Sequence, residues 1–228
     1  MTQDLNHVRN WIFDLDNTLY PPQARLFDQI EVRMATFVAR ELGMTGAQAN
    51  ALRASYWADY GTTLKGLMVN HGIDPVAFLN EVHDISFDEL TPDPELAGHI
   101  DALPGRKIVF TNGDRAYARK VLTARGLNDV FADVFGVEEV RFIPKPESAA
   151  YDHFLDLTKV DPRSAAMFED DPRNLAVPHN MGMRTILVGP GHPPQPHLHH
   201  QTSDLSGFLS QLLGSAFSQA PQTPKSIA

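Results

Sequence analysis

Acidic, basic and hydroxyl residues follow four short apolar runs of this 228-residue sequence. Carboxylates in such positions serve as nucleophiles, as general acids and bases, and as ligands of hard cations. A lysine and a threonine hydroxyl supply the positive charge and the hydrogen-bond donor that a phosphate group requires. The residues concerned are Asp14 and Asp16 after the first run, Thr111 and Asn112 after the second, Lys145 in a Pro-Lys-Pro loop, and Glu169, Asp170 and Asp171 after the fourth.

These residues converge if the apolar runs are parallel strands, because ligands of open parallel sheets bind beyond the carboxyl ends of the strands. Several carboxylates then lie within a few ångströms of one another, and their mutual repulsion requires protons or a cation. The cluster contains no histidine or cysteine, so the sequence predicts a hard divalent ion, with Mg²⁺ as the expected cofactor. The carboxylates in question are those of Asp14, Asp16, Asp170 and Asp171.

The formal net charge is −9, from 28 acidic and 19 basic residues. A surface that binds a nucleic-acid polymer normally carries a basic patch, so this balance argues against such a partner. The same charge repels anionic substrates at long range, so a phosphate site must supply its own positive charge. Lys145 is the residue that we expect to supply it.

Cysteine is absent, which excludes disulfides, thiolate metal sites and thiol nucleophiles. No apolar run is long enough to span a membrane, and the N-terminal MTQDLNHVRN lacks the basic-then-apolar pattern of a secretory signal. We therefore expect a cytoplasmic protein without a membrane partner.

The first apolar run, Trp11-Ile12-Phe13, predicts a short strand, and a helical pattern follows from about residue 21 to residue 88. Apolar residues recur there at spacings of three and four, as on one face of a helix. Gly43, Gly61 and Gly72 interrupt the pattern, and no strand pattern lies between them. This stretch is expected to form about four helices joined by short turns.

The sequence pattern changes after Pro94, where β-prone runs alternate with helical segments. Such alternation is typical of a parallel sheet that is covered by helices on both faces. The predicted strands are Lys107–Phe110, Val130–Phe135, Ala165–Phe168 and Thr185–Val188, and the predicted helices are Arg115–Arg125, Ser148–Thr158 and Asn174–Met181.

Together the patterns predict an α/β protein with a Rossmann-like doubly wound, mostly parallel sheet as its core and an inserted all-helical cap domain. The core is assigned to residues 1–20 and 89–228, and the cap to residues 21–88. Residues 215–228 are expected to form a flexible tail. The histidine- and proline-rich segment 192–200 suits a surface connection, with a transition-metal site as the alternative.

The four motifs resemble those of the haloacid dehalogenase-like hydrolase superfamily. WIFDLDNTLY contains its DxDxT signature, and VFTNG, the lysine of IPKP and MFEDDPRN match its second, third and fourth motifs in order. The likeness covers about residues 11–20 and 106–188. Within the insertion, YWADYGTTLKGLMVNHGID is similar to the helical cap of pyrimidine 5'-nucleotidase-like phosphatases.

The resemblance implies a role for each residue of the first three motifs. Asp14 would be the nucleophile that forms an aspartyl-phosphate, and Asp16 the general acid and base. This second aspartate distinguishes the phosphatases of the superfamily from its dehalogenases. The phosphoryl group would be held by Thr111, Asn112 and Lys145.

The resemblance also implies a magnesium site, formed by the Asp14 side chain, the Asp16 main-chain carbonyl and an acid of the fourth motif. The fourth motif offers three adjacent acids. Aligning Asp171 with the first aspartate of the family's D-S-x-x-D/N run makes it the direct ligand, with Asp170 binding directly or through water. Glu169 is then expected to lie outside the site.

The predicted function is that of a magnesium-dependent phosphomonoesterase, acting on a small metabolite such as a pyrimidine nucleoside 5'-monophosphate. A phosphatase or phosphomutase for sugar or vitamin phosphates is one alternative, and a dehalogenase is another. A receiver-like phospho-acceptor signalling domain is the remote alternative, because it also combines aspartates, a threonine and a lysine on a parallel sheet. In the enzyme reading the cap selects the leaving group, and Tyr20, Tyr60 and Thr63 are candidates to face it.

Overall fold

The computed structural model describes residues 3–131 and 133–216 of the chain. Of the tail that we expect to be flexible, residues 217–228 lie outside the described part. None of the described helices is both long and apolar enough to cross a membrane.

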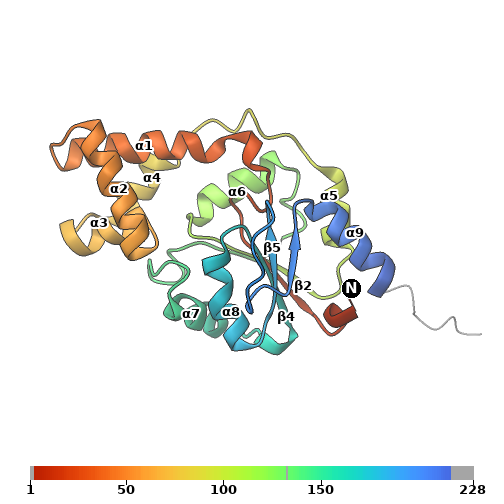
Figure 1. Cartoon of the computed structure of the whole chain (residues 1–228). Coiled ribbons are helices and arrows are strands. Elements are labelled where there is room, and N and C mark those ends of the chain that lie inside the picture. The colour runs from red at the N-terminus through yellow and green to blue at the C-terminus, as the bar shows by residue number, and fades with distance from the viewer. Residues whose placement is uncertain (1–2, 132, 217–228) are drawn as a thin grey trace, which may run out of the picture.

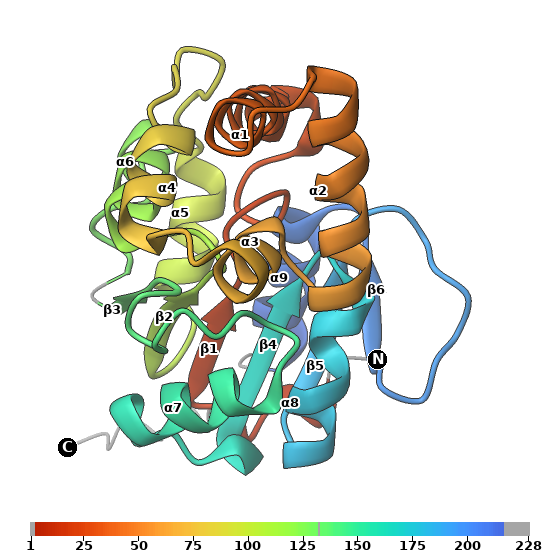
Figure 2. The ribbon, with the colours of Figure 1, turned by 90° about the vertical axis from the view of Figure 1, so that its left-hand side faces the viewer.

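Six strands of the described residues form one sheet in the order β3-β2-β1-β4-β5-β6, and every pairing within it is parallel (Figure 2). The sheet is therefore fully parallel rather than mostly parallel, and the order is that of a doubly wound α/β fold. The strands are β1 (Asn10–Phe13), β2 (Arg106–Phe110), β3 (Asp133–Phe135), β4 (Ala165–Glu169), β5 (Arg184–Val188) and β6 (His200–Thr202).

The centre of the sheet is the place where the strand order reverses. β1 pairs with β2 on one side, where Phe13 is opposite Val109, and with β4 on the other, where Phe13 is opposite Phe168. The amide of Asp14 donates to the carbonyl of Phe168 at 2.9 Å, which joins the two strands at their carboxyl ends. Ligands of such sheets bind at this reversal point, so β1 and β4 deliver their following residues to the expected crevice.

Alternate residues of each strand pack into two separate cores, one on each face of the sheet. On β1, Trp11 and Phe13 belong to the core under α5, α6 and α9, whereas Ile12 belongs to the core under α7 (Figure 1). Burial on both faces explains why the strands are continuous apolar runs. The covering helices are α5 (Pro94–Asp101), α6 (Arg115–Ala124), α7 (Ser148–Thr158), α8 (Ala176–Met181) and α9 (Leu205–Ala216).

The first four of the five α-helices between β1 and β2 form a bundle at one end of the sheet (Figure 2). Their ends carry the signals expected of isolated helices: Thr45 and Gln48 form a capping box, and Asp74 caps the last helix. Gly61 and Gly72 end two of the helices with φ values of 79° and 62°, a conformation that favours glycine. The helices are α1 (Leu26–Glu41), α2 (Gly46–Tyr60), α3 (Thr63–His71) and α4 (Pro75–Val82).

The structure differs from the predicted elements in several places. α5, β6 and α9 were not predicted, and β3 is shorter than its apolar run. Asp93-Pro94 is a helix start, with aspartate as the N-cap and proline in the first turn, rather than only a loop signal. β6 begins at His200, the last residue of the histidine-rich segment, and its polar edge-strand sequence shows no apolar run. The described part of the chain also contains four short 3₁₀ segments, Gln3–Leu5, Pro22–Ala24, Pro162–Ser164 and Pro172–Leu175, and the last of these replaces the start of the helix predicted at Asn174.

Candidate active site

Lys145 lies at the centre of the convergent residues. Its side chain is 1% exposed, and its ammonium donates to Asp14 Oδ1 at 2.7 Å, to Glu169 Oε1 at 2.8 Å and to the carbonyl of Phe110 at 2.9 Å. Burial alone would lower the pKa of Lys145, but the two carboxylates raise it above its usual range. A buried cation with all three donors engaged is thus fixed beside Asp14.

Asp14 follows β1 directly and is 5% exposed. Burial raises its pKa to about 7, against the opposing charge of Lys145. Because Lys145 binds Oδ1, the second oxygen, Oδ2, is the one left for a reacting atom or a cation.

The loop after β2 positions both a hydroxyl and the lysine. Thr111 is buried, and its Oγ1 accepts from the amide of Gly113 at 2.9 Å, so the hydroxyl proton remains available to donate. The Asn112 side chain donates to the Lys145 carbonyl at 3.0 Å and accepts from the Lys145 amide at 2.8 Å. The side chain of Asn112, predicted to bind phosphate, is therefore already used to hold the backbone of Lys145.

Asp16 is held by two tyrosines that the motifs did not indicate as a pair. The hydroxyls of Tyr20 and Tyr117 each donate to Asp16 Oδ1 at 2.6 Å. Burial and the charge of Asp16 raise the pKa of both tyrosines, so both remain protonated donors. With Oδ1 occupied twice, the other oxygen of Asp16 is the one available for proton transfer.

Tyr117 is in turn positioned by the connection from the helical bundle. Its ring stacks on His83 with centroids 4.2 Å apart, and His83 Nδ1 forms a hydrogen bond with Asp114. Asp114 also caps α6 by accepting from the amide of Tyr117 at 2.7 Å. An Asp-x-x-Tyr helix start is the only sequence signal for this arrangement, because His83 is distant in the chain.

The fourth motif is arranged differently from the prediction. Glu169, expected to lie outside the site, is 1% exposed and binds Lys145, the Asn174 amide group and the amide of Asp171. Asp171, expected to be the direct metal ligand, instead binds the guanidinium of Arg173 through both carboxylate oxygens at 2.6–3.1 Å. Asp170 is thus the aspartate beside Asp14, and Asp171 is paired with Arg173.

One carboxylate group among the described residues has the geometry of a cation site. Asp14, Glu169 and Asp170 each place a carboxylate oxygen so that all three lie within 4.8 Å of one another. Burial, together with the charges of Glu169 and Asp14, raises the pKa of Asp170 to about 9. Both oxygens of Glu169 accept from donors, whereas Asp14 and Asp170 each accept through one oxygen, from Lys145 and from Asn17, so these two acids retain an oxygen for a cation.

These residues form one wall of a cavity of about 990 Å³. The helical bundle forms the opposite wall with residues of α1 to α4, so both parts of the chain enclose the space. Contacts between side chains join them: the guanidinium of Arg173 lies 3.8 Å from the centroid of the Trp57 ring, and Lys65 pairs with Glu147 at 3.3 Å. A substrate bound at Asp14 would therefore be enclosed by the helices.

Of the three residues expected to face the leaving group, two lie at the site and one does not. Thr63 lines the cavity, and Tyr20 contacts Asp16, but Tyr60 is not among the lining residues and its hydroxyl faces Asn70.

In the histidine-rich segment, His199 contacts Thr185 and His200 pairs with Asp4. No cluster of metal ligands forms there among the described residues, so the transition-metal alternative gains no support.

Comparison with known proteins adds a family and a fold. A model of the haloacid dehalogenase-like hydrolase family matches residues 8–182. The yeast Phosphate metabolism protein 8, from Saccharomyces cerevisiae, is 28% identical over 193 residues, which are 78% of this chain and 60% of the yeast protein. The matched region thus spans less than two thirds of that relative.

Solved structures share the fold at low identity. The structure of YfnB from Bacillus subtilis bound to magnesium has a TM-score of 0.58 and 15% identity, covering 90% of this chain and 98% of that one. The L-2-haloacid dehalogenase from Xanthobacter autotrophicus has a TM-score of 0.57 and 14% identity, covering 92% and 100%. The same fold therefore carries a dehalogenase, and the chemistry of this chain has to be argued from its own residues.

Proposed function

This chain belongs to the haloacid dehalogenase-like hydrolases, and we propose that it hydrolyses phosphate monoesters through an aspartyl-phosphate on Asp14. The observation that carries the proposal is a pair of carboxylates in one cavity with different surroundings. Asp14 is buried against Lys145, whereas Asp16 is held by two tyrosine hydroxyls. Different environments for two carboxylates are what separate a nucleophile from a general acid.

In the first step, Oδ2 of Asp14 attacks phosphorus, and the bond between phosphorus and the leaving oxygen breaks. Asp16 donates its proton to that oxygen, so the leaving group departs as an alcohol. In the second step, Asp16 takes a proton from a water molecule that attacks the phosphorus of the aspartyl-phosphate. The bond between Asp14 Oδ2 and phosphorus breaks, inorganic phosphate leaves, Asp14 is again a carboxylate and Asp16 again carries its proton.

The phosphoryl group requires donors and positive charge throughout. Lys145 is fixed beside the attacking carboxylate, and the Thr111 hydroxyl has its proton free to donate. Because the side chain of Asn112 holds Lys145, its own contribution to phosphate binding would come from its main-chain amide. Preorganised charge of this kind is the main contribution of a protein to phosphoryl transfer.

The donor set fits a magnesium ion. The raised pKa values of Asp14, to about 7, and of Asp170, to about 9, reflect buried carboxylates that a cation would stabilise. We assign Mg²⁺ to the carboxylates of these two residues and the main-chain oxygen of Asp16, all of them hard oxygen ligands. When bound, the ion neutralises charge on the phosphoryl oxygens. The magnesium in the similarly folded YfnB supports this assignment.

We further propose that residues 21–88 act as a cap over a core formed by residues 1–20 and 89–228. The shared cavity supports this division of labour, because α1 to α4 contribute the wall that faces the leaving group. A small phosphorylated metabolite fits this enclosed site, and a pyrimidine nucleoside 5'-monophosphate remains the leading candidate. Support for the nucleotide comes from the cap sequence alone.

Three other activities are separated by simple observations. A dehalogenase needs neither Asp16 nor a divalent ion, so a chelator would leave its activity unchanged. A phosphomutase would return a phosphorylated product instead of inorganic phosphate. The receiver-like alternative has no counterpart for the bundle of α1 to α4 after β1, and the family match argues against it.

The proposal is tested by incubating the purified protein with Mg²⁺ and a panel of phosphate esters, and by measuring the inorganic phosphate released. We expect multiple turnovers that stop on chelation. Asp14→Asn should lower kcat on the order of a thousandfold or more, as loss of a nucleophile does. Undiminished turnover in that variant would rule out the mechanism.

A further inference from the structure

A buried guanidinium on the cap side of the cavity has no part in the chemistry at Asp14. The side chain of Arg53 is 12% exposed, and its Nε is buried without a hydrogen-bond partner. Nη1 donates to Asn50 Oδ1 at 2.9 Å, and Nη2 to Glu31 Oε1 at 3.3 Å. A buried N–H group without an acceptor is destabilising, so an acceptor supplied by a ligand would stabilise it.

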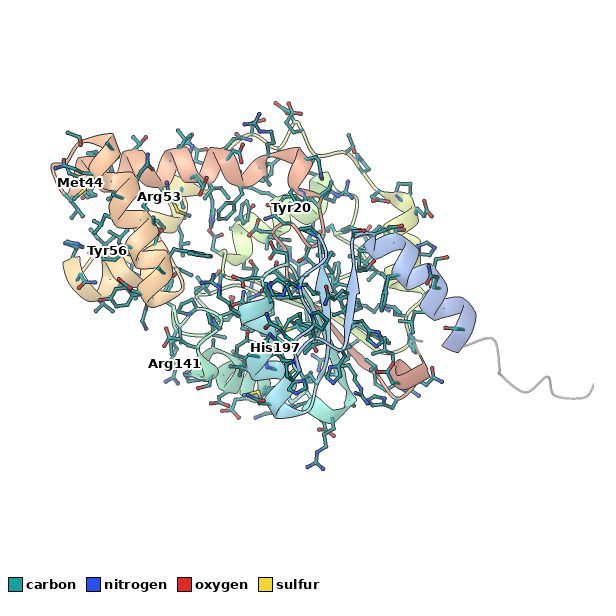
Figure 3. The ribbon with its side chains drawn as sticks, viewed as in Figure 1. Tyr20, Met44, Arg53, Tyr56, Arg141 and His197 are labelled. Atoms are coloured by element: carbon teal, nitrogen blue, oxygen red, sulfur yellow. The ribbon has the colours of Figure 1, made fainter. Side chains whose placement is uncertain are left out.

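Arg53 stands on a continuous stripe of α2 that lines the cavity (Figure 3). The stripe follows the helical repeat, with cavity-lining residues at positions 50, 53, 54, 57, 58 and 61. Its last member touches the phosphate end, because a Cβ atom at Gly61 would lie 3.3 Å from Pro146 Cδ and 3.7 Å from the Lys145 carbonyl. Arg53 precedes Gly61 by two turns of helix, a separation of about 12 Å along the axis.

The space between these two ends is mostly apolar. Phe27, Ile30 and Met34 of α1 line it together with Leu64 of α3 and Phe142. Such a wall suits a planar or apolar body rather than a charged one. The polar groups of the cavity are thus concentrated at the phosphate end and around Arg53.

We propose that Arg53 is a specificity-determining residue that donates hydrogen bonds to a carbonyl or carboxylate oxygen at the far end of the leaving group. The inference rests on the proposed phosphatase function, because it takes the phosphate to lie at Asp14. The site then favours phosphate esters whose leaving group spans about two helical turns, roughly 10 Å, over short esters such as those of glycolate. A guanidinium with several N–H donors at that distance discriminates strongly against analogues that lack the acceptor.

A purely structural role accounts for only part of the arrangement. The ion pair with Glu31 joins α2 to α1, but Glu31 is 54% exposed and leaves Nε of Arg53 unsatisfied. Arg40 shows what a structural arginine looks like in the same bundle. Its Nε, Nη1 and Nη2 all bind the carboxylates of Glu41 and Glu81, and it does not line the cavity.

The test compares Arg53→Met with the matched control Arg40→Met on two pairs of esters. Uridine 5'-monophosphate is paired with ribose 5-phosphate, and 4'-carboxybiphenyl-4-yl phosphate with biphenyl-4-yl phosphate. We expect Arg53→Met to lower kcat/KM about tenfold to a hundredfold for the acceptor-bearing ester of at least one pair, since a hydrogen bond to a charged group is lost. In Arg53→Met, kcat/KM for the partner ester that lacks the acceptor should be unchanged, which also shows that the variant is folded. Arg40→Met should leave the ratio of the two kcat/KM values within each pair as in the wild type.

The responding pair identifies the acceptor as a neutral carbonyl or as a carboxylate. Equal ratios in Arg53→Met and wild type for both pairs would overturn the inference. Calorimetric titration with uridine and with 4'-hydroxybiphenyl-4-carboxylate gives a second readout without turnover, and binding should weaken in Arg53→Met by a similar factor.

The two proposals fail separately. If the wild type cleaves none of the esters yet binds either probe in a manner that depends on Arg53, the phosphatase function is wrong and the subsite stands. If it cleaves the esters while Arg53→Met changes neither the ratios nor binding, the subsite is wrong and the function stands. If it shows neither cleavage nor binding that depends on Arg53, both are wrong.

Discussion

The buried ion triad of Asp14, Lys145 and Glu169 determines what each neighbouring carboxylate can do. Lys145 is shared between the two acids, and the second oxygen of Glu169 accepts from the amide of Asp171. Removing one partner of a buried ion pair leaves a charge uncompensated, so the arrangement depends on all three residues. Glu169 fixes the lysine, and Asp14 keeps one oxygen free to react.

The two aspartates of the fourth motif give a matched pair of variants. Asp170→Asn should raise the magnesium concentration needed for half-maximal activity about tenfold to a hundredfold, because the proposed direct ligand loses its charge. Asp171→Asn removes a partner of Arg173 and should shift that concentration by less than about threefold. Magnesium titrations of activity measure both. A larger shift for Asp171→Asn than for Asp170→Asn would restore the assignment made from the sequence.

The tyrosine pair on Asp16 predicts a dependence on the leaving group. Tyr117→Phe removes one of two donors to Asp16 Oδ1 and should lower kcat/KM for alkyl phosphates about tenfold, within the range of general-acid catalysis. p-Nitrophenyl phosphate should be affected less, because its leaving group departs without a proton.

The control for Tyr117→Phe is Tyr56→Phe, whose hydroxyl contacts His71 in the bundle and does not line the cavity. It should leave kcat/KM unchanged for both classes of ester. An equal loss for alkyl and aryl esters in Tyr117→Phe would mean that the tyrosine acts only on folding.

For single residues, the sequence predicts which residues form the site better than it predicts which residues they contact. Asp14, Asp16, Thr111 and Lys145 lie together as expected, because each follows a strand whose end is evident from its apolar run. The sequence did not show that Asp170 lies beside Asp14 while Asp171 pairs with Arg173, because adjacent residues at a strand end point in different directions and an alignment without coordinates does not show which. The contact of Tyr117 with Asp16 joins residues a hundred positions apart and has no local signature.

Among the elements, the strands were predicted most closely. β1, β2, β4 and β5 lie within one or two residues of their apolar runs, since burial on both faces requires such runs. β6 was missed because a polar edge strand lacks that signal. α9 was missed although its buried leucines, Leu205, Leu209 and Leu212, recur at helical spacing. The bundle was predicted from its helical apolar spacing and from its glycines, two of which end helices with positive φ.

Those two glycines give a test of how α2 reaches the active site. Gly61 and Gly72 share the left-handed conformation, so alanine at either should lower the free energy of unfolding by about 1 kcal/mol. Only Gly61 faces the catalytic loop, where an added Cβ would lie 3.3 Å from Pro146 Cδ; nothing lies within 4 Å of such an atom at Gly72.

Gly61→Ala should therefore lower kcat/KM as well as stability, whereas Gly72→Ala should lower stability alone. Urea denaturation and steady-state kinetics of both variants provide the comparison. Equal kinetic effects would show that contact between the bundle and the Lys145 loop is unimportant for turnover.

For the molecule as a whole, the site is a cavity between two parts of one chain, and its carboxylates oppose folding when no cation is bound. The pKa of Asp14 is raised to about 7 and that of Asp170 to about 9, above the values of the unfolded chain. The folded state then binds more protons than the unfolded state, so stability falls as pH rises through these values.

We therefore expect the Tm of the metal-free protein to decrease between about pH 5 and pH 8. Mg²⁺ should raise Tm more at pH 8 than at pH 5, because it replaces the protons, and Asp170→Asn should weaken both trends. Thermal unfolding with and without chelator across this range measures them. A magnesium effect that is the same at every pH would contradict the proposed ligands.

Covalent phosphorylation of Asp14 is the event on which every proposed catalytic role depends. Asp16→Asn should slow attack by water while still allowing p-nitrophenol to leave, so the intermediate accumulates when this variant meets p-nitrophenyl phosphate and Mg²⁺. Acid quenching, digestion at low pH and mass spectrometry should then find one phosphoryl group on the peptide that contains Asp14, with a matching burst of p-nitrophenol. Release of p-nitrophenol with Asp14 unmodified at every quench time, or with the phosphoryl group on another residue, would contradict the mechanism.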